Sequence, residues 1–299
     1  ANADIVVMSE KAELTVATSG ANASAAEAAK TGVCSVVAKT EEEAVEMVKD
    51  ILVTLPSNNL SGAPAAETAA VGVPSAVASS DAKDVIASVA DPDSFLELSA
   101  SFGQAAVTGL AQISGASVGL VAYTGEIDAD ACAKAARFVR FCDAFSLPVV
   151  SFVNATEFSS LREAVKLSNA YAETTAAKIT VITGEAYGPV YIAVAGRGAN
   201  ADYTMAWADA VVSPIAPAAA ALFLHNGDLK GAEKPVEARQ ALIEEYKKTE
   251  ATPLAAAAQG YIEDVILPEE TRDRIIANLA MLSSKRVSTL PKKHSNIQL

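Results

Sequence analysis

The sequence predicts an α/β fold on two observations. From residue 130 onward, helical patterns at 130–145 and 159–173 alternate with β-branched runs at 149–154 and 179–183. Such alternation is typical of parallel strands joined by helical crossovers. The composition agrees, because 51% of the 299 residues are hydrophobic and only 5% are aromatic. A core of small aliphatic side chains favours helices packed closely on a strand layer.

The first 60 residues carry strand and helix patterns of their own. Residues 4–17 alternate like one or two strands, and residues 41–55 have the period of an amphipathic helix. Thr40 is a suitable N-cap and Glu43 follows three residues later, which is the spacing of a capping box. The predicted apolar stripe is Val45, Val48, Ile51 and Leu52. Since the chain opens on a strand-like run without methionine, we expect it to start within a domain.

A linker is expected after this helix, because residues 56–74 contain three prolines among glycine and other small residues. A second body then begins, with a turn at Gly115. Its first predicted elements are a helix at 81–90 and strands at 95–98, 106–113 and 118–123. The later ones are a helix at 189–199, a strand at 210–213, helices at 217–226 and 236–249, a short strand near Val265 and a helix at 269–286. A spiral of ββα units and a doubly wound sheet both fit this pattern.

The charge and the cysteines limit the partners. A formal net charge of −13 argues against nucleic acid, which needs a basic surface, and against anionic membrane surfaces. Three cysteines without metal-ligand spacing favour reduced thiols and a cytoplasmic protein. The most apolar tract, residues 215–224, is too short to span a bilayer and contains Pro217.

Ionisable catalytic side chains are scarce. Of the two histidines, His225 lies at an expected helix end and His294 in a polar tail, and no G-x-S-x-G elbow precedes either. No metal-binding spacing of His, Cys or Glu exists. On the helix at 130–145, Lys134, Arg137 and Arg140 share a stripe with Phe138 and Phe141, a pattern that fits an aromatic core with solvated charges. We therefore expect neither a nucleophilic triad nor a metal site.

The stretch KITVITGEAYGPVY, residues 178–191, offers another kind of chemistry. A β-branched strand passes through Gly188 into a helix that starts at Pro189. The N–H groups at the start of a helix have no intrahelical acceptor, and the helix dipole is positive there. The amides of Gly188, Val190 and Tyr191 could therefore stabilise an oxyanion, while Pro189 tolerates the position. A purely structural tight turn fits the same residues.

Several segments together resemble one known family. They are LPSNN at 55–59, DPDSFLELSASFGQAAVTGLAQISGASVGLVA at 91–122, KAARFVRFCDAFSLPVVSFVN at 134–154, KITVITGEAYGPVY, the C-terminal block at 252–286 and the ending KKHSNIQL. They resemble the carboxyltransferase subunits of biotin-dependent acyl-CoA carboxylases, such as the propionyl-CoA carboxylase beta subunit, and the alpha subunits of decarboxylase sodium pumps. The resemblance covers the chain well from Asp91 on and more loosely before Asn59.

The resemblance implies two crotonase-like α/β domains, each a spiral of ββα units. Residues 1–60 would be the remnant of a first carboxyltransferase domain, residues 61–80 a linker, and residues 81–299 a complete C-terminal domain. The rest of the first domain, which carries the acyl-CoA pocket in this family, would be missing.

The resemblance also implies the reaction: transfer of a carboxyl group between biotin on a carrier protein and a coenzyme A thioester, or the reverse decarboxylation. Biotin itself supplies the base in this family. The protein contributes paired N–H donors in oxyanion holes, which explains the lack of a catalytic histidine or metal. The implied donors are Gly188 and Val190, and the implied biotin pocket is lined by Tyr187, Pro189, Tyr191 and Ile192.

Three departures from the family pattern surround this site. The Gly-Ala pair of an AYGGAY-type motif falls on Pro189 and Val190, so one donor is lost. The PGF-type loop is shortened to ATEFSS at 155–160, and the AWPTAE segment reads AWADAV at 206–211. The alternative is a non-catalytic or divergent subunit of a carboxylase or decarboxylase complex. A crotonase-type hydratase or isomerase fits less well, because no carboxylate stands beside the turn.

The implied partners are a biotin carboxyl carrier protein, a biotin carboxylase and an acyl-CoA. A homo-oligomer, built as a dimer-based hexamer, is expected because the family forms its active site between subunits. A membrane would be involved only indirectly, if the chain served a decarboxylase pump.

Overall fold

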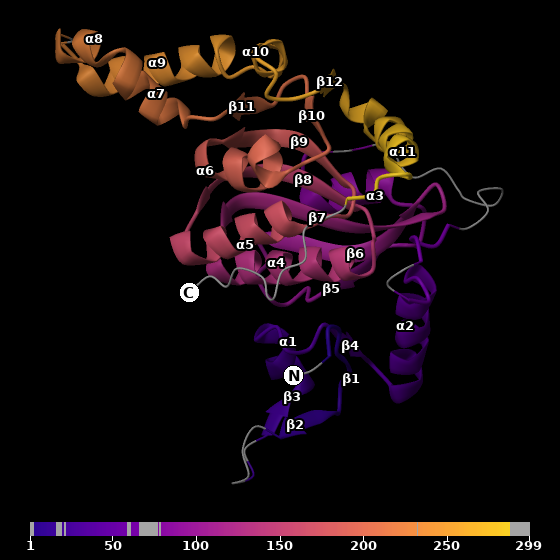
Figure 1. Ribbon diagram of the computed structural model, residues 1–299. Helices are drawn as coiled ribbons and strands as arrows, with labels where there is room; N and C mark the ends of the chain where they lie inside the picture. The colour runs from indigo at the N-terminus through magenta and orange to yellow at the C-terminus, as the bar shows by residue number, and fades with distance from the viewer. Residues whose placement is uncertain are drawn as a thin grey trace.

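The computed structural model describes residues 3–15, 20, 22–58, 61–65, 77, 79–231 and 233–287. A large sheet with flanking helices forms the main body, a small N-terminal unit lies beside β5, and a helical arm extends from the opposite side (Figure 1). The predicted linker and the KKHSNIQL ending lie mostly or wholly outside the described residues, as does His294.

The N-terminal unit has its own small core. Strand β1 (Val7–Ser9) pairs in parallel with β4 (Val36–Ala38), and β2 (Glu13–Thr15) pairs antiparallel with β3 (Asn22–Ser24). Helix α1 (Ala25–Lys30) begins with a capping box between Ser24 and Glu27. The buried residues between these elements are Met8, Ala25, Ala28, Ala29 and Cys34.

Helix α2 (Glu41–Thr54) confirms the predicted helix but not its buried stripe. Thr40 caps it by accepting the Glu43 N–H at 3.2 Å, whereas the Glu43 carboxylate accepts from the Lys39 N–H at 2.6 Å rather than from Thr40. Of the predicted stripe only Ile51 is buried in the main core. Val45, Val48 and Leu52 are exposed.

The main sheet has the order β12–β10–β9–β8–β7–β6–β5, with β11 beside β9. The strands are β5 (Leu96–Leu98), β6 (Ala106–Ile113), β7 (Ala116–Ile127), β8 (Val149–Phe158), β9 (Lys178–Tyr187), β10 (Tyr203–Trp207), β11 (Val211–Ser213) and β12 (Asp264–Ile266). The first three pair antiparallel, and every later pair is parallel. The spatial order follows the chain, without the reversal that defines a doubly wound sheet. The observed sheet therefore excludes that alternative.

The turn between β6 and β7 confirms the role predicted for Gly115. Ser114 and Gly115 have φ values of 50° and 78°. Two successive positive φ values are the geometry of a two-residue hairpin whose twist matches the strands.

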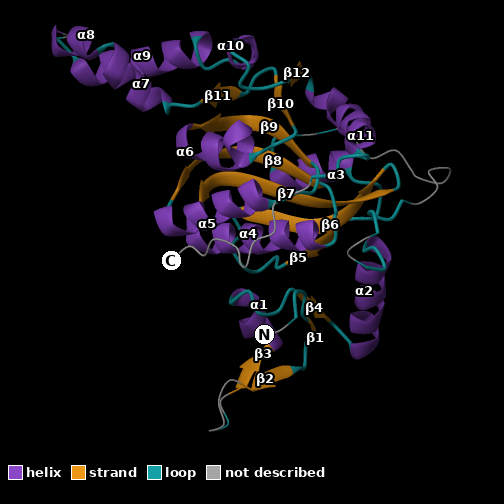
Figure 2. Ribbon diagram, in the orientation of Figure 1, coloured by secondary structure: helices purple, strands orange, loops and turns teal. Residues whose placement is uncertain are grey.

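Helices cover the sheet closely. α4 (Ala129–Ala144) and α5 (Leu161–Glu173) run side by side along one face (Figure 2). A Cβ on Gly119 of β7 would lie 2.4 Å from the Cys142 sulfur of α4, so the approach of helix to strand requires glycine. α3 (Ala82–Val89) and α11 (Thr271–Leu282) contact each other and reach β7 and β9 respectively. This close packing agrees with the small-residue composition.

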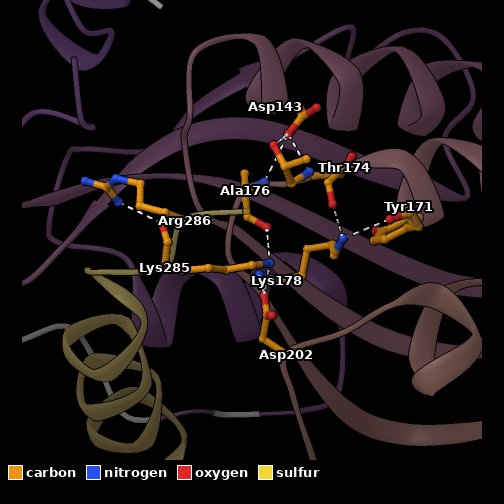
Figure 3. Close-up of polar contacts among 9 residues, drawn as sticks. Asp143, Tyr171, Thr174, Ala176, Lys178, Asp202, Lys285 and Arg286 are labelled. Atoms are coloured by element: carbon orange, nitrogen blue, oxygen red, sulfur yellow. Dashed lines mark hydrogen bonds and ion pairs between the residues drawn. The ribbon is translucent and has the colours of Figure 1, made fainter. Parts of the chain in front are cut away.

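Buried Lys178 joins three elements at the start of β9 (Figure 3). Its ammonium donates to the Tyr171 and Thr174 carbonyls at the end of α5, at 2.9 and 2.6 Å. Asp202 accepts from the Lys178 N–H and from Lys285 Nζ, both at 2.8 Å. Burial lowers the pKa of Lys178 to about 8. The polar cluster thus ties β9 to α5 and to the segment after α11.

Four helices form the arm: α7 (Pro217–Leu224), α8 (Asn226–Gly231), α9 (Pro235–Thr249) and α10 (Pro253–Ala258). α7 and α9 pack against each other and extend away from the sheet (Figure 1). The sequence predicted α7 and α9 but missed α8 and α10. Within the described ranges, no helix combines the length and apolarity needed to cross a bilayer.

Candidate functional site

The β9–α6 turn, residues 184–192, contains the residues implicated by the sequence. Strand β9 continues to Tyr187, four residues beyond its predicted end. Helix α6 (Gly188–Val190) starts at Gly188, so Pro189 is its second residue rather than its first. Gly188 has a φ of +56°, a conformation that a residue with a Cβ rarely adopts. The glycine is therefore required by the backbone of the turn.

The helix predicted at 189–199 is divided into three short pieces. α6 leads into a π-helix at Tyr191–Ala195, and a 3₁₀ turn follows at Arg197–Ala199. The wide turn closes through the Gly196 N–H, which donates to the Tyr191 carbonyl at 2.6 Å. A Cβ on Gly196 would lie 2.7 Å from the Tyr191 ring, so glycine lets this ring fill the space. Single π-turns are frequent at functional sites.

The backbone amides of the turn differ in their partners. The Tyr191 N–H donates to the Gly188 carbonyl, so this amide is not available to a ligand, in contrast to the sequence-based expectation. Gly188 and Val190 occupy the first and third helical positions, whose N–H groups have no intrahelical acceptor. Pro189 between them has no N–H. Both residues are buried, and Val190 is 0% exposed, so their N–H groups are candidate donors by position alone.

The side chains of the turn fall into an inner and an outer group. Val190 and Tyr191 are buried, whereas Pro189 and Ile192 are exposed and Tyr187 is half-buried. The Tyr191 hydroxyl donates to the Tyr261 carbonyl at 2.7 Å, and burial raises its pKa to about 12. Tyr191 is thus a positioning residue held by the core, while Tyr187, Pro189 and Ile192 face accessible space.

Two contacts to α9 hold the strands that lead into the turn. Lys247 Nζ lies 2.6 Å from Glu185 Oε1, and the Tyr246 hydroxyl lies 3.1 Å from Ser213 Oγ. Ser213 is the register partner of Tyr187. Burial, and after it the Glu185 charge, raise the pKa of Tyr187. The sequence could not show these contacts, because 62 residues separate Lys247 from Glu185 and 33 separate Tyr246 from Ser213.

The start of α7 lies directly beside the turn. The Cβ position of Gly188 is 3.6 Å from the backbone nitrogen of Ala216, the residue before Pro217. A cavity of about 450 Å³ adjoins this region, with walls that include Ser213, Ile215, His225 and Tyr261. Residues 186–192 are not among the residues that line this cavity. The turn therefore lies next to the cavity rather than in its wall.

The remaining candidates have structural surroundings. His225 ends α7, as expected. Arg137 donates to the Ala3 and Asp4 carbonyls, and Arg140 donates to Asn169 Oδ1. All three cysteines are buried and unpaired, and burial raises the pKa of each thiol. Across the described segments no three His, Cys, Asp or Glu residues gather as metal ligands would.

Comparison with known proteins relates the chain to a known family. The carboxyl transferase domain family matches residues 14–297. The propionyl-CoA carboxylase carboxyltransferase subunit of Haloferax mediterranei is 37% identical over 295 residues, which cover 90% of this chain and 57% of the relative. The methylmalonyl-CoA decarboxylase alpha subunit of Veillonella parvula is 34% identical over 293 residues, which cover 90% of this chain and 56% of that relative. The chain thus spans a little over half the length of these relatives.

A solved structure agrees over nearly the whole chain. Transcarboxylase 12S, described as a hexamer assembly with methylmalonyl-CoA bound, superposes with a TM-score of 0.87 at 32% identity. The match covers 99% of this chain and 64% of that one. It confirms the expected crotonase-like α/β fold.

Proposed function

This chain belongs to the carboxyl transferase domain family, and we propose that it transfers a carboxyl group between biotin on a carrier protein and an acyl-CoA. The same site would serve the reverse decarboxylation. The relatives named as propionyl-CoA carboxylase and methylmalonyl-CoA decarboxylase support both directions. The observation that carries the proposal is the β9–α6 turn, where a glycine at positive φ places two helix-start amides beside exposed side chains.

In this proposal the chain supplies hydrogen-bond donors. Biotin, when bound, would supply the carboxyl group and the base that removes the α-proton of the acyl-CoA. The amides of Gly188 and Val190 would stabilise the negative charge that develops at the start of α6, where the helix dipole is positive. Fixed backbone donors need no titration, which fits a turn without a histidine or a reactive thiol.

The side chains of the turn would bind and orient biotin. Tyr187, Pro189 and Ile192 offer aromatic and aliphatic surface beside the donors. Tyr191 would line the site from the inside, since its hydroxyl is fixed by Tyr261. Lys247 is neutralised, because it pairs with Glu185. The site would thus recognise biotin mainly by shape and backbone hydrogen bonds.

Pro189 supports a second candidate, a non-catalytic or divergent subunit of a biotin-dependent complex. Losing one donor of an oxyanion hole typically reduces the rate by roughly 10²–10³. If Gly188 and Val190 do not replace that donor, the chain keeps the fold and an assembly role only.

Decarboxylation of methylmalonyl-CoA with free biotin tests the proposal, using the full polypeptide that carries this sequence. We expect biotin-dependent turnover that falls at least tenfold in Gly188→Ala, because a Cβ disfavours the +56° φ and shifts the amides. Gly227→Ala is the matched control, since its Cβ would contact nothing within 4 Å. Equal activity of Gly188→Ala and wild type would overturn the assignment of the donors. No biotin-dependent turnover in the wild type would favour the assembly role.

We further propose that the chain works in a homo-oligomer with a biotin carboxyl carrier protein and a biotin carboxylase. The description of transcarboxylase 12S as a hexamer supports the homo-oligomer. The arm supports it independently, because Phe223 is 90% exposed and Ile215, Leu222 and Leu224 lie near it in the chain and are also exposed. An apolar surface of this kind is expected to be covered by a second copy of the chain.

The domain division is proposed as follows. Residues 1–60 form the last part of a first carboxyltransferase domain, residues 61–80 a linker, and residues 81–299 the second domain. The separate small core around Met8 and Cys34 supports the division, although Ile51 packs into the main core. The unpaired cysteines support a cytoplasmic location.

A further inference from the structure

A cavity of about 460 Å³ lies between the N-terminal unit and the main body. Its walls come from two segments far apart in the chain, residues 3–35 and residues 98–141, and share no residue with the β9–α6 turn. The volume falls within the range of about 300–1,000 Å³ that is usual for small-molecule sites.

Lys134 of α4 contributes the buried charge of this cavity. The sequence predicted a solvated charge here, but the residue is only 6% exposed, and its ammonium donates to the Phe102 carbonyl at 3.0 Å. Among the described residues, no carboxylate lies within ion-pair distance of it. Burial lowers the pKa of Lys134 to about 8, chiefly by removing water from the ammonium. An ammonium has three N–H donors, so further acceptors would stabilise its charged form.

The rest of the wall is largely apolar. Leu98, Phe102 and Phe138 line it together with Val6 and Leu14 of the N-terminal unit. These side chains would exclude water from a hydrocarbon chain but could not satisfy a second charge.

The rim of the cavity is also positive. Arg137, one turn along α4 from Lys134, donates to the Ala3 and Asp4 carbonyls at 2.8 and 2.9 Å and so holds the N-terminal segment against α4. Asp4 is the one acidic residue in the described wall. In a chain of net charge −13, this local positive charge points to an anion.

We propose that this cavity binds an aliphatic monocarboxylate, with its carboxylate on Lys134 and its hydrocarbon chain against Phe102 and Phe138. A single buried ammonium matches a single negative charge. A phosphate dianion would leave one charge unpaired in an apolar site, which is unfavourable. The site goes beyond the proposed carboxyl transfer and does not depend on it.

Isothermal titration of the full chain with octanoate tests the proposal directly. We expect saturable binding at one site, with octanol, the neutral analogue, at least tenfold weaker. Affinity should rise about fourfold for each CH₂ added from hexanoate to octanoate, as expected for apolar burial. No saturable binding, or equal affinity for octanoate and octanol, would overturn the proposal.

Three variants locate the site. Lys134→Met should reduce octanoate affinity at least tenfold and remove the preference over octanol. Val33→Trp should also reduce affinity, because Val33 lines the cavity with a half-exposed side chain and the larger ring fills the space without removing Lys134. Lys49→Met deletes an exposed charge on α2 and should bind octanoate like wild type. With folding verified by circular dichroism, unchanged octanoate binding in both Lys134→Met and Val33→Trp would refute the site.

Discussion

Arg272 Nη2 lies 2.6 Å from Asp91 Oδ1, although 181 residues separate them. The pair joins α11 to the β6–β7 turn, because the Asp91 carboxylate also accepts the Ser114 and Gly115 N–H groups, each at 2.8 Å. Arg272 donates in addition to the Val89 carbonyl at the end of α3. One buried carboxylate thus connects a hairpin turn and two helices.

Asp91→Asn should therefore destabilise the fold by about 3 kcal/mol, since removing one charge of a buried pair leaves the other uncompensated. Urea unfolding followed by circular dichroism measures this change. Glu97→Gln is the control, because it breaks the exposed Lys83–Glu97 pair and should change the free energy of unfolding by less than about 1 kcal/mol. Similar losses of unfolding free energy in both variants would show that the buried Asp91 contacts contribute no more than an exposed ion pair.

Lys178 should make the stability of wild type depend on pH. Its pKa falls from 10.5 in the unfolded chain to about 8 in the fold, so the folded protein binds fewer protons between these values. Stability then rises with pH, and the cost of burying the ammonium is greatest below pH 8 and vanishes above about pH 10.5. The full span is about 3 kcal/mol.

Urea unfolding at pH 7.5, 8.5 and 9.5 checks this prediction. The free energy of unfolding of wild type should rise relative to that of Lys178→Met across the series. Lys49→Met, which lacks an exposed lysine, should follow wild type. A constant difference between Lys178→Met and wild type would mean that Lys178 keeps an ordinary pKa.

Gly196→Ala should destabilise the wide turn after α6. The new methyl group would lie 2.7 Å from the Tyr191 ring, and Tyr191 is anchored by Tyr261, so the ring cannot simply move aside. We expect a loss of about 2 kcal/mol, typical of overpacking. Thermal unfolding compares it with Gly227→Ala, whose added methyl group would meet open space. If both variants unfold at the same temperature as wild type, the turn tolerates a methyl group.

Phe223→Ser should weaken self-association, because it removes the most exposed aromatic side chain of the arm. Sedimentation velocity over a range of concentrations should show a shift toward smaller species. Leu161→Ser, which changes an equally apolar exposed residue on α5, should leave the distribution unchanged. A shift in the control alone would place the contact surface on α5 instead of the arm.

The sequence predicted helices and strands most accurately where the local apolar pattern agrees with the packing in the fold. β6 was predicted with its observed bounds, and α4 within one residue at each end, because their apolar periods coincide with burial. β10 was missed, since its YTMAW run lacks β-branched residues other than Thr204 and becomes a strand only through pairing with β9 and β12. The intrinsic strand propensity of a segment has less influence on its structure than such pairing with neighbouring strands.

The candidate site was predictable only in part. Glycine, proline and a β-branched strand identified the turn at residues 184–192, since these residue types restrict the backbone directly. The division of the following helix depends on Tyr191 packing against Gly196, and the Lys247–Glu185 contact depends on where α9 lies. Neither of these two contacts has a signal in the local sequence. The placement of the donors on Gly188 and Val190 stays a prediction.

The order of the strands has a consequence for biosynthesis. Because β5 to β10 are neighbours in the sheet in the same order as in the chain, a ribosome releases each of the parallel strands β8, β9 and β10 just as the edge that receives it is complete. The antiparallel hairpin of β6 and β7 can form first, from local contacts, and serve as the template for β8, β9 and β10. Growth can thus proceed vectorially during translation, and only the late arrival of Arg272 locks the finished sheet to its oldest part.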